Sequence, residues 1–234
     1  MKMKFANRYD RNKSTLSEED CFRLQKSRVL VVGCGGLGGH VIEGLGRLGI
    51  GRITVVDDDV FDETNLNRQL LSTESLIGKP KAEAAVARMK EVNSEVQMDG
   101  LVCRMTIKNA KEIIKGHDLV VDALDNIESR LLLEETCQEL GIPMIHGAIG
   151  GWYGQVAVIM PGQPLLKKIY GGTGEAWENG LEEELGNPYF TPAVIAGIQV
   201  AECAKVLIEN EGALRGRILT VDLENLEFDI LDIE

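Results

Sequence analysis

A glycine-rich segment near the start of the chain constrains the fold more than any other feature. Residues 28–32 are apolar after the first and predict a buried strand, and residues 37–48 have the spacing of a helix. Between them, Gly33, Gly35 and Gly38 follow the pattern Gly-x-Gly-x-x-Gly, with Gly36 as a further glycine. Glycines at such a turn let a phosphate approach the backbone N–H groups at a helix N-terminus. The segment therefore predicts a strand–turn–helix unit that binds a nucleotide phosphate, with a plain strand–helix turn as the alternative.

The rest of the chain continues the alternation of strands and helices up to about residue 149. A possible capping box, Ser17 to Asp20, marks the start of a short helix. Strands are expected at 28–32, 52–56, 96–103, 118–122, 143–149 and 155–160, and helices at 37–48, 79–92 and 126–140. This order predicts an α/β fold with a Rossmann-like, doubly wound and mostly parallel sheet. A helix over 191–209 and strands at 217–223 and 226–230 predict a C-terminal antiparallel extension.

Composition narrows the class of protein. The 234 residues carry a net charge of −12 and are 44% hydrophobic, which is typical of one soluble globular domain over 1–234. We expect a cytoplasmic protein without a membrane span, because no secretory signal and no long apolar run stand out. Proteins that bind nucleic acid usually have a basic face, so the acidity makes a nucleic-acid partner unlikely without excluding it. The stretch 161–188 lacks periodicity and is expected to be a functional or disordered loop.

Carboxylates follow the second expected strand. Asp57 stands about twenty residues after the glycine turn, where a carboxylate accepts hydrogen bonds from ribose hydroxyls. Asp59 faces the same way one pleat further on and is a second candidate, whereas Asp58 fits a solvated loop position.

Amide and cationic side chains come next along the chain. Asn65, Arg68 and Gln69 lie in a polar stretch, and Lys81 lies at the start of the helix expected at 79–92. A cation at a helix N-terminus opposes the helix dipole, so Lys81 is easier to explain if it faces phosphate. Arginine and lysine stabilise the charge that develops on a leaving pyrophosphate. Lys79 is expected to be exposed.

Two further carboxylates end the strand expected at 118–122. Asp122 and Asp125 stand at the binding edge of a parallel sheet, with Asn126 next to them. Asp125 is the candidate ligand for Mg²⁺ against the phosphates of a nucleotide, and Asp122 and Asn126 are candidates for nucleotide contact. The alternative for Asp125 is an N-cap of the following helix.

These segments occur in the order found in the ThiF/MoeB/HesA family, which the chain resembles from about residue 7 to residue 231. The matching segments are Arg8–Arg11, Gly33–Gly38, Asp57–Val60, Asn65–Gln69, Gly78–Lys81, Asp122–Asn126 and Gly151–Gln155. They are also similar to the adenylation domain of ubiquitin-activating enzymes.

The resemblance implies an adenylyltransferase that uses ATP and Mg²⁺. Its substrate would be the C-terminal Gly-Gly carboxylate of a small ubiquitin-like sulfur carrier of the ThiS or MoaD kind. Asp57 would then bind ribose, Asn65, Arg68 and Lys81 would contact phosphates, and Asp125 would hold Mg²⁺. Arg11 would reach across the interface of a homodimer to the nucleotide of the partner subunit. Residues 28–150 would bind the nucleotide and residues 151–234 the carrier.

The cysteines depart from the family pattern. The five of them form no Cys-x-x-Cys pair, so no zinc site is expected. None lies between Cys137 and Cys203, and Cys203 falls in a helix that reads as packed. We therefore expect adenylation without a thioester on the enzyme itself, and a separate sulfur donor.

The sequence leaves three other functions open. A tRNA-modifying relative would share the adenylation residues, and a non-catalytic scaffold would bind the carrier without chemistry. An oxidoreductase that binds NAD would use the glycine turn and Asp57, but it would leave Arg68, Lys81 and Asp125 unexplained.

Overall fold

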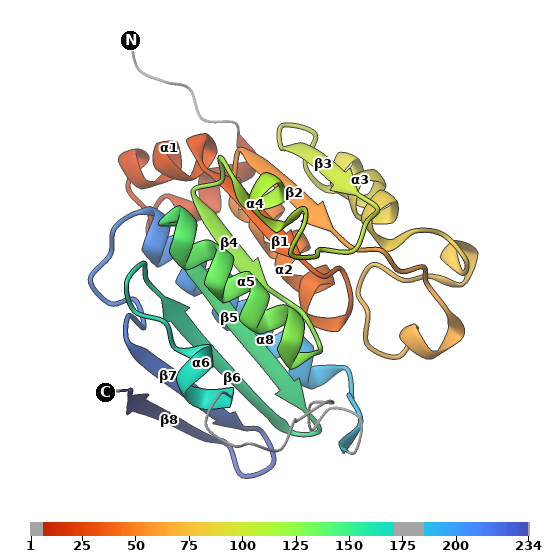
Figure 1. The fold of residues 1–234 in the computed structure, drawn as a ribbon. Helices are drawn as coiled ribbons and strands as arrows, with labels where there is room; N and C mark the ends of the chain where they lie inside the picture. The colour runs from red at the N-terminus through yellow and green to blue at the C-terminus, as the bar shows by residue number, and fades with distance from the viewer. Residues whose placement is uncertain (1–6, 171–184, 234) are drawn as a thin grey trace.

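The computed structural model describes residues 7–170 and 185–233, which are arranged around one sheet of eight strands (Figure 1). The strand order is β3-β2-β1-β4-β5-β6-β7-β8. The first five of these positions are parallel, and β6, β7 and β8 are antiparallel to their neighbours. The strands are β1 Arg28–Val32, β2 Arg52–Val56, β3 Gln97–Leu101, β4 Leu119–Asp122, β5 Met144–Gly150, β6 Tyr153–Ile159, β7 Arg217–Asp222 and β8 Glu227–Asp232. The predicted fold class, including the antiparallel extension, is confirmed.

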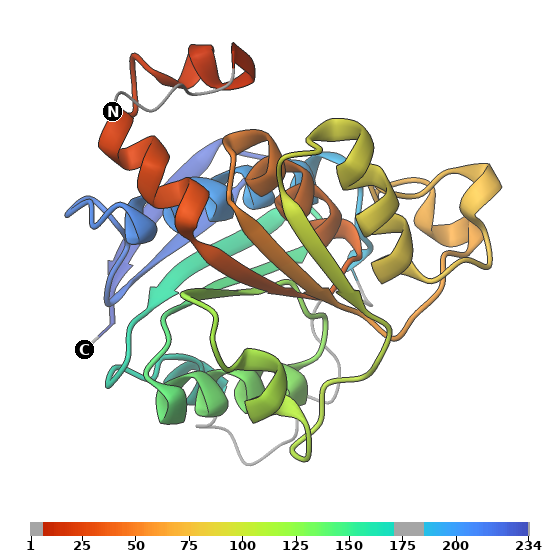
Figure 2. The ribbon, with the colours of Figure 1, turned by 90° about the horizontal axis from the view of Figure 1, so that it is seen from above.

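Helices cover both faces of the sheet (Figure 2). One face carries α2 (Gly36–Leu48), α3 (Lys81–Val92) and α8 (Phe190–Leu207), and the other carries α4 (Ala110–Ile114), α5 (Ile127–Leu140) and α6 (Leu166–Tyr170). The remaining described helices are α1 (Glu18–Lys26) and the short 3-10 helices η1 (Asn7–Asn12), η2 (Glu63–Asn65) and η3 (Glu74–Leu76). Because successive strand residues point to opposite faces, Val29 and Val31 enter the core under α2, while Leu30 and Val32 enter the core under α5.

Local sequence signals set several of these elements. The capping box of α1 is confirmed: the Ser17 hydroxyl accepts a hydrogen bond from the Asp20 N–H at 3.1 Å, and the Asp20 carboxylate accepts one from the Ser17 N–H at 2.9 Å. The helices α4 and α6 were not predicted, since five residues are too few to show a helical period. Helix α6 lies inside the aperiodic stretch 161–188, of which residues 171–184 lie outside the described residues.

Helix α8 lies where the sequence predicted a helix over 191–209, and it is strongly apolar. By length and composition alone its 18 residues, with a mean hydropathy of 1.4, would suffice to cross a membrane. In the fold it packs against α2 and β5, and two of its buried polar side chains form hydrogen bonds. Gln199 donates to the Asp122 carbonyl, and Glu202 accepts from the Leu214 N–H. These contacts are those of a core helix.

Candidate functional site

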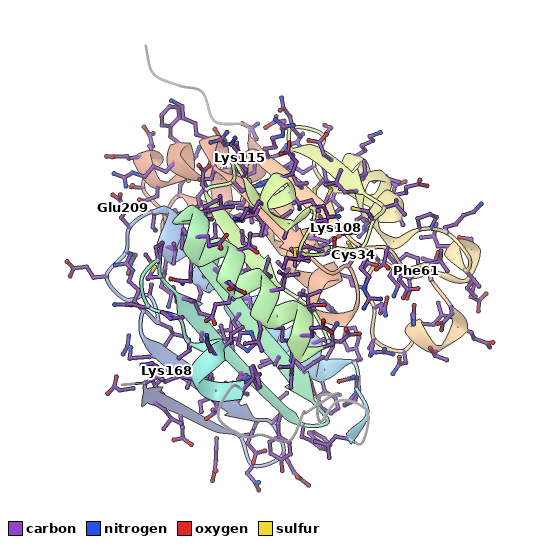
Figure 3. All side chains as sticks on the ribbon, viewed as in Figure 1. Cys34, Phe61, Lys108, Lys115, Lys168 and Glu209 are labelled. Atoms are coloured by element: carbon purple, nitrogen blue, oxygen red, sulfur yellow. The ribbon has the colours of Figure 1, made fainter. Side chains whose placement is uncertain are left out.

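The turn between β1 and α2 can be built only with glycine at two of its positions. Gly33 has φ of +99°, and a Cβ there would lie 2.5 Å from the Ala123 carbonyl oxygen of the neighbouring loop. A Cβ at Gly38 would lie 1.9 Å from the Gly33 carbonyl oxygen, so this glycine lets the helix close onto the strand. Cys34 lies at the turn between them, fully buried (Figure 3). The glycine pattern therefore holds the start of α2 against the end of β1.

A cavity of about 670 Å³ opens at the carboxyl ends of β1, β2 and β4. In an open α/β sheet this edge, where the chain order reverses, is the usual place for a ligand. The cavity brings together most of the residues singled out by the sequence. They are Gly33, Gly35, Gly36, Asp57, Asp58, Asp59, Arg68, Gln69, Lys81, Asp125 and Asn126.

The Asp57 carboxylate ties the glycine turn to the end of β2. It accepts hydrogen bonds from the Cys34 N–H at 2.6 Å and from the Asp59 N–H at 2.8 Å. Burial raises the pKa of this carboxyl above that of a free aspartate, and the two N–H groups oppose the rise. Asp57, directly after β2, therefore lies against the glycine turn, and it lines the cavity.

Lys81 and Asp59 form an ion pair in the same cavity. The Lys81 ammonium lies 2.5 Å from the Asp59 carboxylate, and the lysine side chain is only 7% exposed, whereas that of Asp59 is 61% exposed. Lys81 is the first residue of α3, after Pro80. The fold therefore places a buried cation at a helix N-terminus, on the wall of the cavity.

The polar stretch after β2 divides into residues that line the cavity and one that does not. The Arg68 guanidinium donates to the Thr64 carbonyl at 2.8 Å, and Gln69 is 6% exposed with its Oε1 lacking a partner among the described residues. Asn65 is buried outside the cavity lining. Its amide forms a capping box with Asp62 at the start of η2. Asn65 thus supports the loop that carries Arg68.

The loop after β4 separates the two roles considered for Asp125. The N-cap of α5 is Asn126, whose Oδ1 accepts from the Ser129 N–H at 2.9 Å, so the capping alternative for Asp125 is wrong. The Asp125 side chain is exposed on the cavity wall and accepts a hydrogen bond from the neighbouring Asn126 amide at 3.2 Å. Its carboxylate is accessible to a ligand.

Asp122 lies behind this loop and not in the cavity lining. It is fully buried, accepts from His146 Nδ1 at 2.7 Å and from the Leu124 N–H at 3.0 Å, and has Arg130 at 3.8 Å. These contacts satisfy the carboxylate inside the core. The structure gives Asp122 the position of a support for the loop, in contrast to the direct contact that the sequence suggested.

Arg11 lies at the other end of the sheet. Tyr9 of the same 3-10 helix accepts a hydrogen bond from Asn93 and packs beside Gly49, near the start of β2. The cavity is at the carboxyl ends of the strands, so the exposed Arg11 side chain does not line the cavity of its own chain.

The cavity also contains residues that sequence reasoning missed. They are Cys103, Arg104 and Met105 after β3, Ser129 on α5 and Asn187 before α8, together with apolar neighbours. The residues after β3 were accessible to prediction, because the end of a third parallel strand reaches the same edge. Asn187 was not, since only the tertiary fold returns that segment to the cavity.

The buried cysteines are held as thiols. Burial raises the pKa of Cys137 to about 12 and that of Cys203, in α8, still further. Among residues 7–170 and 185–233, no three His, Cys, Asp or Glu side chains come together as a metal site.

Fold and cavity together define a nucleotide-binding α/β protein of the doubly wound class. A family described as the ThiF family matches residues 9–234. The SAMP-activating enzyme E1 of Haloferax volcanii is 38% identical over 210 residues, covering 88% of this chain and 77% of that protein. The sulfur carrier protein adenylyltransferase of Thermus thermophilus is 35% identical over 223 residues, covering 90% of this chain and 80% of that protein.

Solved structures agree on the fold. A crystal structure of E. coli MccB with MccA-N7isoASN has a TM-score of 0.83 at 20% identity, covering 99% of this chain and 73% of that one. The chain belongs to the ThiF family, and it is an adenylyltransferase of the ThiF/MoeB type.

Proposed function

We propose that this protein adenylates the C-terminal Gly-Gly carboxylate of a small ubiquitin-like sulfur carrier of the ThiS or MoaD kind. The observation that carries the proposal is that Arg68, Lys81 and Asp125 line one cavity with the glycine turn. Two cations and a carboxylate beside a phosphate-binding turn suit phosphoryl-group chemistry more than hydride transfer. The named relatives that act on sulfur carriers, and the SAMP-activating enzyme, support the choice of acceptor.

In the proposed reaction, a carrier carboxylate oxygen attacks the α-phosphorus of ATP. The new O–P bond forms as the bond from the α-phosphorus to the bridging oxygen breaks, and that electron pair leaves with pyrophosphate. No acid–base pair is required, because the nucleophile is already ionised at neutral pH. The protein contributes positioning and neutralisation of charge.

The candidate site residues have the following roles in this scheme. The Asp57 carboxylate accepts hydrogen bonds from the ribose hydroxyls, with Asp59 beside it. The glycine N–H groups and the Arg68 and Lys81 side chains contact the phosphates. Gln69 and Asn126 complete the cavity wall next to the nucleotide, and Asn65 and Asp122 hold the loops behind it.

Mg²⁺ fits the same arrangement. The ion is commonly held by one or two carboxylates together with the phosphates of a nucleotide, and Asp125 offers such a carboxylate on the cavity wall. When bound, Mg²⁺ neutralises phosphate charge. Asp125 would hold it, and Asn126, by taking the N-cap, leaves Asp125 free for that role.

In the proposed homodimer, Arg11 of each subunit reaches the nucleotide cavity of the other subunit. Within one chain Arg11 lies away from the cavity, so it contacts a nucleotide only if a partner subunit brings its own Arg11 there. Charge on a leaving pyrophosphate is the natural target of an arginine supplied in this way.

The cysteines support a reaction that stops at the carrier adenylate. Cys203 is fully buried in α8 and its raised pKa disfavours the thiolate that a thioester would need. A separate sulfur donor would then attack the adenylate, and we propose that this takes place in the cytoplasm.

ATP–pyrophosphate exchange tests the proposal. The purified protein is assayed alone and with Gly-Gly-terminated carriers from the same organism, and exchange is expected with at least one carrier. The matched control is the same carrier extended by one residue, which hides the Gly-Gly carboxylate and should abolish exchange. Exchange that is absent with every carrier, or that requires tRNA instead, would contradict the proposed acceptor.

A further inference from the structure

A second hollow, a groove of about 560 Å³, lies beside the nucleotide cavity on the α5 and α6 side of β5–β8. Two rows of directly paired strand residues form its floor. The first row is Ala148, Gln155, Thr220 and Asp229, and the second is Gly150, Tyr153, Asp222 and Glu227. Paired residues point to the same face of a sheet, so each row crosses four strands from β5 to β8.

The inner end of the groove adjoins the nucleotide cavity. Ile149 lines both hollows. Arg130, on the groove wall and 2% exposed, donates to the carbonyl of Leu124 at 2.5 Å, and Leu124 lines the nucleotide cavity. A chain laid along the groove would therefore end near the nucleotide.

The outer end of the groove is acidic. Glu227 and Asp229 of β8 are exposed, point to the groove face, and form no ion pair with any described residue. They stand two residues apart on one strand, about 7 Å from each other, so their negative charges repel. The nearby carboxylates Asp222 and Glu224 raise the pKa of Tyr153, which lies in the same row as Glu227.

The three groove acids are not equivalent. The Asp222 carboxylate is already used in the turn between β7 and β8, where it accepts from the N–H groups of Glu224 and Asn225. Glu227 and Asp229 have no such partners among residues 7–170 and 185–233. Of the three described groove acids, these two are available to pair with a basic side chain.

Between the two ends the groove is largely apolar. Its walls include Ile127, Ile169 and Leu185, and Tyr153 and Leu185 are 45% and 48% exposed. An extended peptide with small or apolar residues in its middle and a basic residue at the outer end complements this surface.

We infer that the groove selects carriers whose C-terminal tail has a lysine or arginine upstream of Gly-Gly, which pairs with Glu227 and Asp229. The inference rests on the proposed function, which supplies the tail, and adds the charge that the tail must carry. From β5 to β8 the groove spans three strand spacings, roughly 14 Å, which about four extended residues cover.

The test uses the carrier that supports exchange, in two versions. One version has lysine and the other glutamate at positions about four to six residues before the carboxyl terminus. An exposed ion pair changes an equilibrium constant by roughly two- to fivefold, so two such contacts predict a KM about tenfold lower for the lysine version. The difference should shrink as salt is raised from about 0.05 to 0.5 M, because salt screens exposed charges.

Charge reversal on the enzyme locates the effect. Glu227→Lys combined with Asp229→Lys should abolish or reverse the preference. The matched control, Asp232→Lys, lies on the same strand but points to the opposite face and should keep it. Lysine is well tolerated on an edge strand, and an unchanged melting temperature shows that the variants are folded.

Two results would overturn the inference: equal KM values for the two tails with the wild-type enzyme, or a preference that survives the double reversal. Absence of exchange with the natural carrier would instead contradict the proposed function. The two failures are therefore distinguishable.

Discussion

Lys81 offers the sharpest separation of chemistry from stability in this protein. Its ammonium lies 2.5 Å from the Asp59 carboxylate at the first position of α3, and its side chain is 7% exposed. Replacing it with methionine keeps the length and the packing of the apolar stem and removes the charge. Lys79, two residues earlier and exposed, is the matched control.

The expected loss of stability in Lys81→Met is small. The Asp59 side chain is 61% exposed and stays hydrated without its partner, so the lost ion pair is worth at most about 1 kcal/mol. Removing a cation from a helix N-terminus stabilises the folded state by about 0.3 kcal/mol, because the cation opposes the helix dipole. The free energy of unfolding should therefore change by less than about 1 kcal/mol, measured by urea denaturation.

The expected loss of activity is much larger. Removing one group that stabilises developing charge in a transition state costs about 10²- to 10³-fold, or roughly 3–4 kcal/mol. Carrier-dependent ATP–pyrophosphate exchange should fall by this factor in Lys81→Met, while Lys79→Met should keep nearly wild-type exchange. Activity within a few-fold of wild type would remove Lys81 from the proposed chemistry. A drop in stability of several kcal/mol would show instead that the ion pair is structural.

Four further outcomes are expected. Asp125→Asn should raise the Mg²⁺ concentration needed for exchange by about tenfold or more, which is the scale of one charge-assisted contact. The melting temperature should stay unchanged, because Asn126 and not Asp125 caps α5. An unchanged Mg²⁺ titration would contradict the metal role. Arg11→Ala should lose exchange. When its subunits are mixed with those of Lys81→Met and allowed to re-form dimers, about a quarter of the wild-type exchange should return. The reason is that half of the dimers then contain one subunit of each variant, and each of these dimers has one intact site. No recovery would place Arg11 outside the site of a partner. Cys203→Ser should leave exchange intact and lower stability by about 1–3 kcal/mol, since its hydroxyl is buried; a reducible carrier conjugate trapped on Cys203 in the wild type would contradict the absence of a thioester. Burial raises the pKa of Asp57 above 3.8. The contribution of this one carboxyl to the free energy of unfolding is therefore present at low pH and is lost as the pH rises through the pKa of the folded state. ATP affinity should show the opposite trend, weakening as the pH falls toward that raised pKa, and Asp57→Asn should remove this dependence in binding titrations.

Local chemistry was enough to predict the first half of the fold. The glycine spacing from Gly33 to Gly38, the apolar strands and the capping box at Ser17 are short-range signals. They act through backbone sterics and hydrogen bonds between near neighbours. For the same reason Asp57 could be placed from its distance along the chain to the glycine turn.

The tertiary structure decided which polar residues face the cavity. Asn65 and Asn126 have the same side chain, yet Asn65 completes the capping box of Asp62 behind the cavity, whereas Asn126 caps α5 on the cavity wall. Asp122 turns into the core to meet His146, while Asp125, three residues later, remains exposed. Sequence spacing cannot separate these outcomes, because a cap, a buried partner and a ligand all use the same donor and acceptor atoms.

The sequence by itself determined the class of protein: a strand–glycine turn–helix unit with a carboxylate and cations at set intervals along one chain. Only the tertiary structure decided how β6, β7 and β8 extend the sheet, and hence that Glu227 and Asp229 lie in one groove with Arg130. The physical reason is range. Backbone geometry and capping act over a few residues, whereas strand order and side-chain burial depend on contacts between segments far apart in the sequence.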